Sequence, residues 1–190
     1  GLFNILHYRD NVCHINIDSK TFPEILCDVH NIPIKSDSFD SAICSELFEH
    51  TEHPPEILLE IYRILKPGGF LLITVPFIFG VHADPFDYAR YTDYYWRKNL
   101  TQVGFTIISI KNQGGIYAVI IHFLLTWYKE LQLLKISKIK QLILKIIFHR
   151  FISFLFKLET SFQQEKENHY ENDKNTLGYE IIVQKSIPVS

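Results

Sequence analysis

The residues best suited to chemistry lie in the stretch 76–92, directly after the continuous apolar run 70–75 (FLLITV). This stretch contains three candidate catalytic residues that can accept a proton, His82, Asp84 and Asp87. Histidine is the natural base near neutral pH, and such a base accelerates a reaction by about 10²–10⁴-fold. The stretch also has side chains that can position a polar acceptor: Tyr88, Arg90 and Tyr91.

A structural role is the alternative for each of these residues. Asp84 and Pro85 can form a turn, and Arg90 can pair with Asp87 to brace the loop. The stretch nevertheless contains more polar chemistry than a connection needs. It also follows the carboxyl end of an apolar strand, where open α/β folds bind their ligands. We therefore predict that the loop as a whole is functional.

The elements before this loop predict how it is positioned. Residues 41–45 (SAICS) form a short apolar run, typical of a buried strand. The prolines at 54–55 favour the first turn of a helix, where a backbone amide would be unpaired anyway. Apolar residues at three- and four-residue spacing continue this helix to about Lys66, a turn at 67–69 (PGG) ends it, and 70–75 predicts a strand covered on both faces. Strand, helix and strand in this order form a βαβ unit of a parallel sheet.

A second polar group follows the first of these strands. Glu46, Glu49 and His50 are spaced by three and four residues, so they would share one face if the segment were helical. They also lie at the carboxyl end of a predicted strand. His50 is therefore a fourth candidate catalytic residue.

A larger set of residues has a characteristic order and spacing: Asp28, Ile32, Pro33, Ile34, Ser38, Phe39, Asp40, Glu49, His50, Glu60, Arg63, Leu65, Lys66, Pro67, Gly68 and Gly69. In this order the set resembles class I S-adenosylmethionine-dependent methyltransferases, specifically the methyltransferase type 11 group. The resemblance extends over about residues 1–115. It implies an α/β fold with a Rossmann-like sheet of parallel strands and a final antiparallel strand, for which 179–183 (YEIIV) is the best candidate.

The resemblance implies S-adenosyl-L-methionine as the cofactor. Gly1 would be the last glycine of a glycine-rich turn, so that the chain would lack the first strand and most of this turn. Asp18 follows a strand predicted at 13–17 and would bind the ribose hydroxyls, an ordinary turn residue being the alternative. After a brief strand predicted at 25–27, Asp28 would reach the adenine amino group. The other implied contacts are Val29 beside the adenine ring and Cys44 and Ser45 under the methionine part.

The resemblance also raises the question of a metal. Some family members that methylate quinone precursors hold a divalent ion with an E-x-x-E-H pattern, which Glu46, Glu49 and His50 match here. The alternative, which we favour, is that no metal binds and that Glu49 and His50 shape the wall of the active site.

The chain as a whole divides into four regions. Residues 1–115 would form the cofactor-binding core, with a helix from Thr92 to about Val103, a break at Gly104 and a strand at 105–110. Residues 116–164 form an apolar and basic helical insertion, residues 165–177 form a polar loop, and residues 178–186 form the final strand. A further helix is predicted over residues 2–8. The helices of the insertion would either lie on a membrane surface, with lysine stems reaching the headgroups, or cap the sheet or form a homodimer through 116–158.

Composition narrows the possible partners. The net charge is −2 and no Lys/Arg-rich block is present, which argues against nucleic acid. Three scattered cysteines and the lack of a charged-then-apolar leader favour a cytoplasmic protein, with the inner membrane face as a peripheral site.

We therefore expect a methyltransferase acting on a hydroxyl of a glycan, lipid-linked or other small-molecule acceptor. The string from His82 to Thr92 resembles a subgroup associated with bacterial surface glycans. Two alternatives stay open, a methyltransferase for a quinone or prenyl-lipid precursor and a non-catalytic remnant of the fold.

Overall fold

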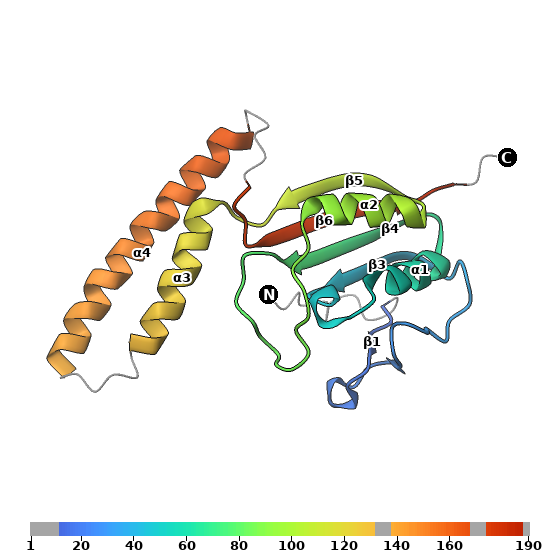
Figure 1. The fold of residues 1–190 in the computed structure, drawn as a ribbon, viewed down its shortest axis with the longest axis horizontal. Helices are drawn as coiled ribbons and strands as arrows, with labels where there is room; N and C mark the ends of the chain where they lie inside the picture. The colour runs from blue at the N-terminus through green and yellow to red at the C-terminus, as the bar shows by residue number, and fades with distance from the viewer. Residues whose placement is uncertain (1–11, 132–137, 168–173, 188–190) are drawn as a thin grey trace.

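The central layer of the protein is a four-stranded sheet. The computed structural model describes residues 12–131, 138–167 and 174–187 (Figure 1). The sheet has the strand order β3-β4-β6-β5, with β3 at Phe39–Ser45, β4 at Leu65–Pro76, β5 at Phe105–Asn112 and β6 at Gly178–Lys185. Strands β3 and β4 are parallel, whereas β6 is antiparallel to both of its neighbours. The predicted α/β class and the antiparallel final strand are thus confirmed.

The strands predicted at 13–17 and 25–27 are shorter than expected. They form β1 (Ile15–Asn16) and β2 (Ile25–Leu26), which pair in parallel as a separate two-stranded sheet. In the part of the chain that the structure describes, the strands are thus divided between two sheets. Gly1 and the helix predicted over residues 2–8 lie outside the described residues.

Helices α1 (Pro54–Ile64) and α2 (Asp93–Val103) lie side by side over one face of the large sheet (Figure 1). Their apolar stripes meet the sheet in one core, which contains Phe48 and Trp96 with their rings packed edge to face at 5.1 Å. As predicted, Thr92 caps α2 by accepting a hydrogen bond from the amide of Tyr95, and Gly104 ends it with a φ of +110°.

The start of β4 differs from the prediction. Helix α1 ends at Ile64 and the strand begins directly at Leu65, so residues 67–69 are part of a bulge and not a separating turn. The pairing changes there from Phe39 opposite Leu65 to Ser41 opposite Phe70. Glycine is required at position 69, because a Cβ atom there would lie 2.8 Å from the carbonyl oxygen of Lys66.

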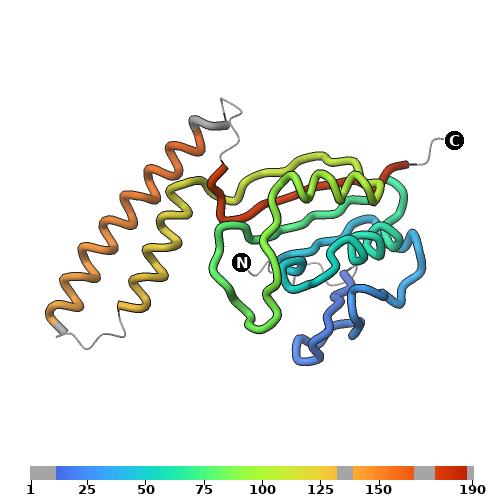
Figure 2. Tube along the Cα trace, in the orientation of Figure 1, coloured from blue at the N-terminus to red at the C-terminus, as the bar shows by residue number. Residues whose placement is uncertain are grey.

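The insertion forms a hairpin of two helices, α3 (Ile116–Leu131) and α4 (Lys138–Glu167). The helices run side by side, and the hairpin projects away from the sheet (Figures 1 and 2). Of the alternatives for these helices, capping of the sheet is therefore wrong. Helix α4 also continues to Glu167, past the predicted start of the polar loop at 165, because Gln, Glu and Lys are themselves good helix formers. Residues 168–173 of that loop lie outside the described residues.

Candidate active site

The candidate site lies where β3 and β4 end side by side. Ser45 and Thr74 are paired in the last register position of these strands, and their hydroxyl oxygens lie 2.8 Å apart. Beyond β3 the chain forms a short 3₁₀ turn, η4 (Phe48–His50), and beyond β4 it forms the long loop 77–92. The loop returns to η4, where the amide of Tyr88 donates a hydrogen bond of 2.8 Å to the carbonyl oxygen of Glu49.

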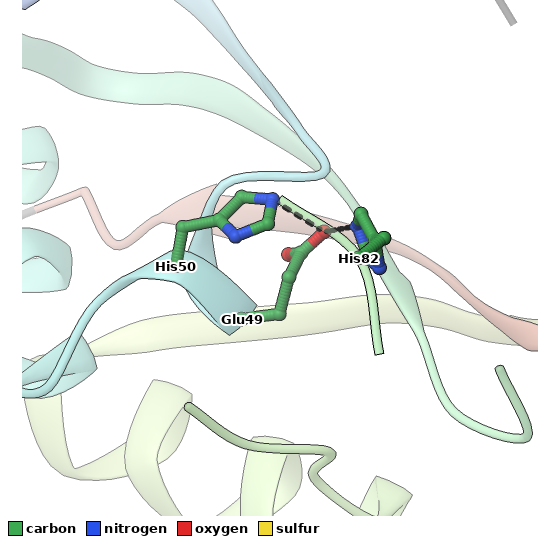
Figure 3. Close-up of side chains that lie close together, drawn as sticks. All are labelled: Glu49, His50 and His82. Carbon is green, nitrogen blue, oxygen red and sulfur yellow. Dashed lines mark ion pairs between the residues drawn. The ribbon is translucent and has the colours of Figure 1, made fainter. Parts of the chain in front are cut away.

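Three side chains from these two segments converge, Glu49 and His50 from η4 and His82 from the loop (Figure 3). We call them the Glu49 cluster. The Nε2 atoms of His50 and His82 lie 3.6 and 3.8 Å from the same carboxylate oxygen, Oε1 of Glu49. The carboxylate is 1% exposed, and this burial raises the pKa of Glu49. Within the described residues, neither oxygen of Glu49 has a hydrogen-bond partner.

Both imidazole rings are oriented by their other nitrogen. The Nδ1 atom of His50 lies 2.6 Å from the carbonyl oxygen of Phe86, so it must carry the proton and donate. The Nδ1 atom of His82 lies 3.3 Å from the carbonyl oxygen of Gly80 and 3.4 Å from the Asp87 carboxylate. In the neutral ring of His50 the unprotonated Nε2 therefore faces Glu49. The Nδ1 atom of His82 also lies 3.4 Å from a terminal nitrogen of Arg90, which can only donate, so the contacts of His82 fit either tautomer. Two ring nitrogens and a carboxylate oxygen thus meet at one place, which suits a proton or a cation.

Asp87 and Arg90 hold the loop in this position. Arg90 donates hydrogen bonds from both terminal nitrogens to the Asp87 carboxylate and another to the carbonyl oxygen of Gly80, at 3.1 Å. The carboxylate also accepts a hydrogen bond from the amide of His82, at 2.8 Å. The hydrogen bonds from Arg90 hold the pKa of Asp87 well below its usual range. Asp87 therefore stays charged, which favours the bracing role over that of a base.

A depression of about 190 Å³ adjoins the cluster, and it is lined by Phe79, Val81, Asp87, Tyr88, Ala89 and Arg90. Two of the three predicted acceptor-binding residues, Tyr88 and Arg90, thus face one hollow. Tyr91 instead stacks on Tyr95 with ring centroids 4.1 Å apart and packs against the core. Asp84 and Glu46 are exposed and lie outside the Glu49 cluster.

The predicted cofactor residues lie at the ends of β1, β2 and β3. Asp18 caps a short 3₁₀ turn, η3 (Ser19–Thr21), through the amide of Lys20. Asp28 accepts hydrogen bonds from the amide and the ring of His30, while Val29 packs against the core. Cys44 is also part of the core, and burial raises the pKa of its thiol to about 12. Only the backbone of Cys44 can therefore face a ligand.

The sequence indicated each of the three residues of the Glu49 cluster, but it did not predict that they meet. His82 is 32 and 33 positions away from its two partners, and only the return of the loop to η4 brings them together. The metal set considered from the sequence included Glu46, which lies outside the cluster and has a φ of +51°, and it lacked His82. The one signal in the sequence was that both segments follow neighbouring strands of a βαβ unit.

Comparison with known proteins identifies the fold family. A family model described as a methyltransferase domain matches residues 7–73. This part of the chain is thus similar to a methyltransferase domain. Over 51 residues it is 37% identical to a demethylmenaquinone methyltransferase of Protochlamydia amoebophila, a match that covers 27% of this chain and 21% of that protein. The chain covers between 9% and 21% of the curated relatives that it matches.

Solved structures that resemble this chain in fold include a cyclase and a methyltransferase. The [4+2]-cyclase SpnF has a TM-score of 0.56 at 16% identity, covering 97% of this chain and 70% of that one. A SAM-dependent methyltransferase from Archaeoglobus fulgidus has a TM-score of 0.53 at 15% identity, covering 90% and 74%. At these identities the likeness shows the class I methyltransferase fold alone, and the fold of a cyclase and a methyltransferase does not decide the reaction.

Proposed function

We propose that the protein is an S-adenosylmethionine-dependent methyltransferase that methylates a hydroxyl group of a lipid-linked acceptor, such as a lipid-linked glycan. The observation that carries this proposal is the Glu49 cluster beside the hollow of Tyr88 and Arg90. Methyl transfer to oxygen needs a group that takes up the hydroxyl proton next to a site that holds the acceptor. The methyltransferase domain supports the choice of cofactor.

The proposed reaction is a direct displacement. The acceptor hydroxyl gives its proton to a lone pair of the cluster, at Nε2 of His82 or His50. Its oxygen then bonds to the methyl carbon of the sulfonium, and the carbon–sulfur bond breaks with its electron pair remaining on sulfur. The products are a methyl ether and S-adenosylhomocysteine. The protein mainly holds the two reactants in line, which alone removes a large part of the barrier.

Three exposed groups are proposed to hold the cofactor. The Asp18 carboxylate would bind the ribose hydroxyls, the Asp28 carboxylate the adenine amino group, and Ser45 the methionine part. Val29 would pack beside the adenine ring. Each carboxylate lies two residues after the end of a strand, β1 or β2, where this type of fold binds ligands.

Calorimetric titration with S-adenosylmethionine tests the cofactor site. Asp28→Ala should weaken binding, while Asp40→Ala is the matched control, because Asp40 is an exposed carboxylate that pairs with Lys66 on the surface. Equal affinities of the parent and both variants would contradict the assignment of Asp28. Transfer of a labelled methyl group to polyprenyl-linked glycans then tests the reaction. Cofactor binding without transfer to any such acceptor would favour the non-catalytic alternative.

The helical hairpin supports a lipid-linked acceptor. Its exposed apolar side chains include Ile139, Ile143, Ile147, Phe151 and Phe154, which follow α4 at intervals of three and four residues. A second stripe on α4 already packs against α3. Insertion into a bilayer interface would remove the exposed apolar side chains of this stripe from water, as in interfacial amphipathic helices. No described helix is long and apolar enough to cross a membrane.

The charges of the hairpin favour an anionic membrane over a second copy of the chain. Lys140, Lys145, Arg150 and Lys157 are exposed on α4, and no acidic residue occurs between positions 138 and 158. Each such charge near an anionic surface contributes about 1 kcal/mol of binding. In a dimer through the same face, Lys140, Arg150 and Lys157, which lie on the side of α4 that carries this stripe, would face cations of the second copy and repel them.

Flotation with vesicles distinguishes the two occupants. The chain should float with vesicles of phosphatidylglycerol and phosphatidylcholine at low salt, and not with phosphatidylcholine alone. A stable dimer that does not float would favour the homodimer. Methylation of a quinone or prenyl-lipid precursor is the second candidate, because the name of the Protochlamydia relative refers to demethylmenaquinone. Such precursors belong in the same acceptor screen, and they would be reached from the same membrane surface.

A further inference from the structure

The buried Glu49 carboxylate calls for a positive partner. Its side chain is 1% exposed, and both of its oxygens lack a hydrogen bond to any described part of the chain. Burying an ionised carboxylate without compensation is costly, and native proteins pair such groups with a cation or bind a metal. The nearest groups are the ring nitrogens of His50 and His82, at 3.6 and 3.8 Å. Both distances exceed that of a hydrogen bond, so neither ring nitrogen satisfies the carboxylate.

The two histidines are oriented as metal ligands are. A ligating histidine usually donates its second ring N–H to a carbonyl or carboxylate, which fixes the ring and its tautomer. His50 donates to the carbonyl oxygen of Phe86. The Nδ1 atom of His82 faces the carbonyl oxygen of Gly80 and the carboxylate of Asp87, and a terminal nitrogen of Arg90 lies 3.4 Å from it. The nitrogens left for coordination are both Nε2, and both face Glu49 (Figure 3).

The ligand atoms have nearly the spacing that a metal requires. All three lie within 4.8 Å of one another. In a tetrahedral zinc site with ligands at about 2.0–2.1 Å, neighbouring ligand atoms are about 3.4 Å apart. Small side-chain rotations would close this difference. The histidine side chains are 25% and 34% exposed, so an ion can enter from solvent.

We propose that Glu49, His50 and His82 bind a divalent transition-metal ion, with Zn²⁺ as the first choice. Two imidazoles and one carboxylate suit Zn²⁺ better than Mg²⁺, which prefers oxygen ligands. Three protein ligands leave a fourth position open, as in catalytic zinc sites. His82 supplies the ligand that the E-x-x-E-H pattern lacks, and Glu46 is not needed.

In the proposed reaction the ring nitrogens of the cluster take up the proton of the acceptor hydroxyl. A bound ion would instead make that hydroxyl more acidic. A hydroxyl that coordinates a divalent ion loses its proton more readily, so an acceptor in the open position would be activated there. The inference itself does not rest on the proposed reaction. Metal binding is measured without cofactor or acceptor, so its failure and the failure of methyl transfer are separate results.

Calorimetric titration of the metal-free chain with Zn²⁺ tests the site. Cys13→Ser and Cys27→Ser are introduced first, because these free thiols near the two-stranded sheet could bind zinc themselves. We expect one ion per chain. His82→Ala and Glu49→Gln should each weaken binding by about 100-fold or more, which exceeds the about 10–100-fold effect of residues that only orient a ligand. His53→Ala is the matched control, an exposed histidine whose side chain makes no capping hydrogen bond.

Thermal unfolding gives a second readout on the same proteins. Zinc should raise the melting temperature of the parent and of His53→Ala but not that of Glu49→Gln, a variant of nearly unchanged shape. Near-ultraviolet circular dichroism confirms that each variant is folded before titration. The proposal is overturned if folded Glu49→Gln and His82→Ala bind Zn²⁺ as tightly as the parent, if the parent binds none, or if it prefers Mg²⁺.

Discussion

The helices on the sheet and the helices of the hairpin use apolar residues in opposite ways. The apolar stripe of α1 is buried in the core, where Ile57 and Leu58 are fully buried. Among the described apolar side chains of α4 only Ile152 and Leu155 are buried, although the helix is almost three times as long, at 30 residues against 11. A helix whose apolar stripe is buried within the chain contributes to the stability of the fold. A helix that keeps a second apolar stripe exposed can bind a partner with it.

The largest expected effect tests the core side of this comparison. Phe48→Ala removes a fully buried ring that packs against Trp96, and it should lower the free energy of unfolding by about 3–5 kcal/mol. Phe154→Ala is the matched change on the hairpin, where the ring is 55% exposed, and it should change stability by less than about 0.5 kcal/mol. Urea unfolding measures both. Similar losses in the two variants would mean that the exposed stripe of α4 is covered within the chain.

The next effect concerns the charges of the hairpin. Lys140→Gln together with Lys145→Gln should weaken binding to anionic vesicles about 30-fold, since each lysine contributes about 1 kcal/mol at such a surface. The matched control is Lys66→Gln with Lys98→Gln, which removes the same charge from outside the hairpin. Vesicle sedimentation at several salt concentrations gives the affinities. An equal loss of vesicle affinity in the control pair would show that the vesicles attract the charge of the whole molecule, and that the hairpin has no specific role.

A smaller effect tests how the hairpin is held together. The Glu159 carboxylate accepts hydrogen bonds from the amides of Gly115 and Ala118, at 2.6 and 3.2 Å, and so satisfies the N-terminus of α3 from α4. Glu159→Ala should cost about 1–2 kcal/mol and act mainly on the hairpin. Hydrogen exchange should become faster in α3 and α4 and stay unchanged in β4.

Glu130→Ala serves as the control for this prediction, because Glu130 is an exposed carboxylate at the other end of the same hairpin. If exchange became faster throughout the sheet of Glu159→Ala, the hairpin and the sheet would unfold as one unit. The comparison between the two helical regions would then have to be revised.

The smallest effect is expected for a charge on the sheet-covering helices. Arg97 lies 3.5 Å from Asp93, one turn away on α2, and both side chains are partly exposed. Arg97→Ala should change stability by about 0.5 kcal/mol or less, because exposed ion pairs are screened. Vesicle binding should not change. A clear loss of lipid binding in this variant would extend the binding surface from the hairpin to α2.

The sequence predicted the local elements well wherever a pattern and its end signals agreed. Thr92 and Gly104 marked the two ends of α2, and the apolar run at 70–75 marked the central part of β4. It failed where two patterns competed. At 65–69 the glycines indicated a turn, yet the chain continues the strand through a bulge whose register is set by pairing with β3. Such pairing is a non-local interaction that propensity does not contain.

The candidate site was predicted in parts. The sequence indicated His50, His82, Asp87 and Arg90, because each follows the carboxyl end of a predicted strand. It left open whether Asp87 was a base or a brace, and the contact with Arg90 favours the brace. The buried state of Glu49 was not accessible, because burial depends on how the loop folds back over η4.

The sequence by itself determined the βαβ core, the antiparallel final strand and the apolar, basic character of the insertion. These follow from periodicity and end signals within single segments, which act over a few residues. Only the tertiary structure decided that the hairpin stands away from the sheet and that Glu49, His50 and His82 meet (Figures 1 and 3). The physical reason is that both depend on contacts between segments far apart in the chain, and their geometry is fixed only when the strands pair and the loop closes.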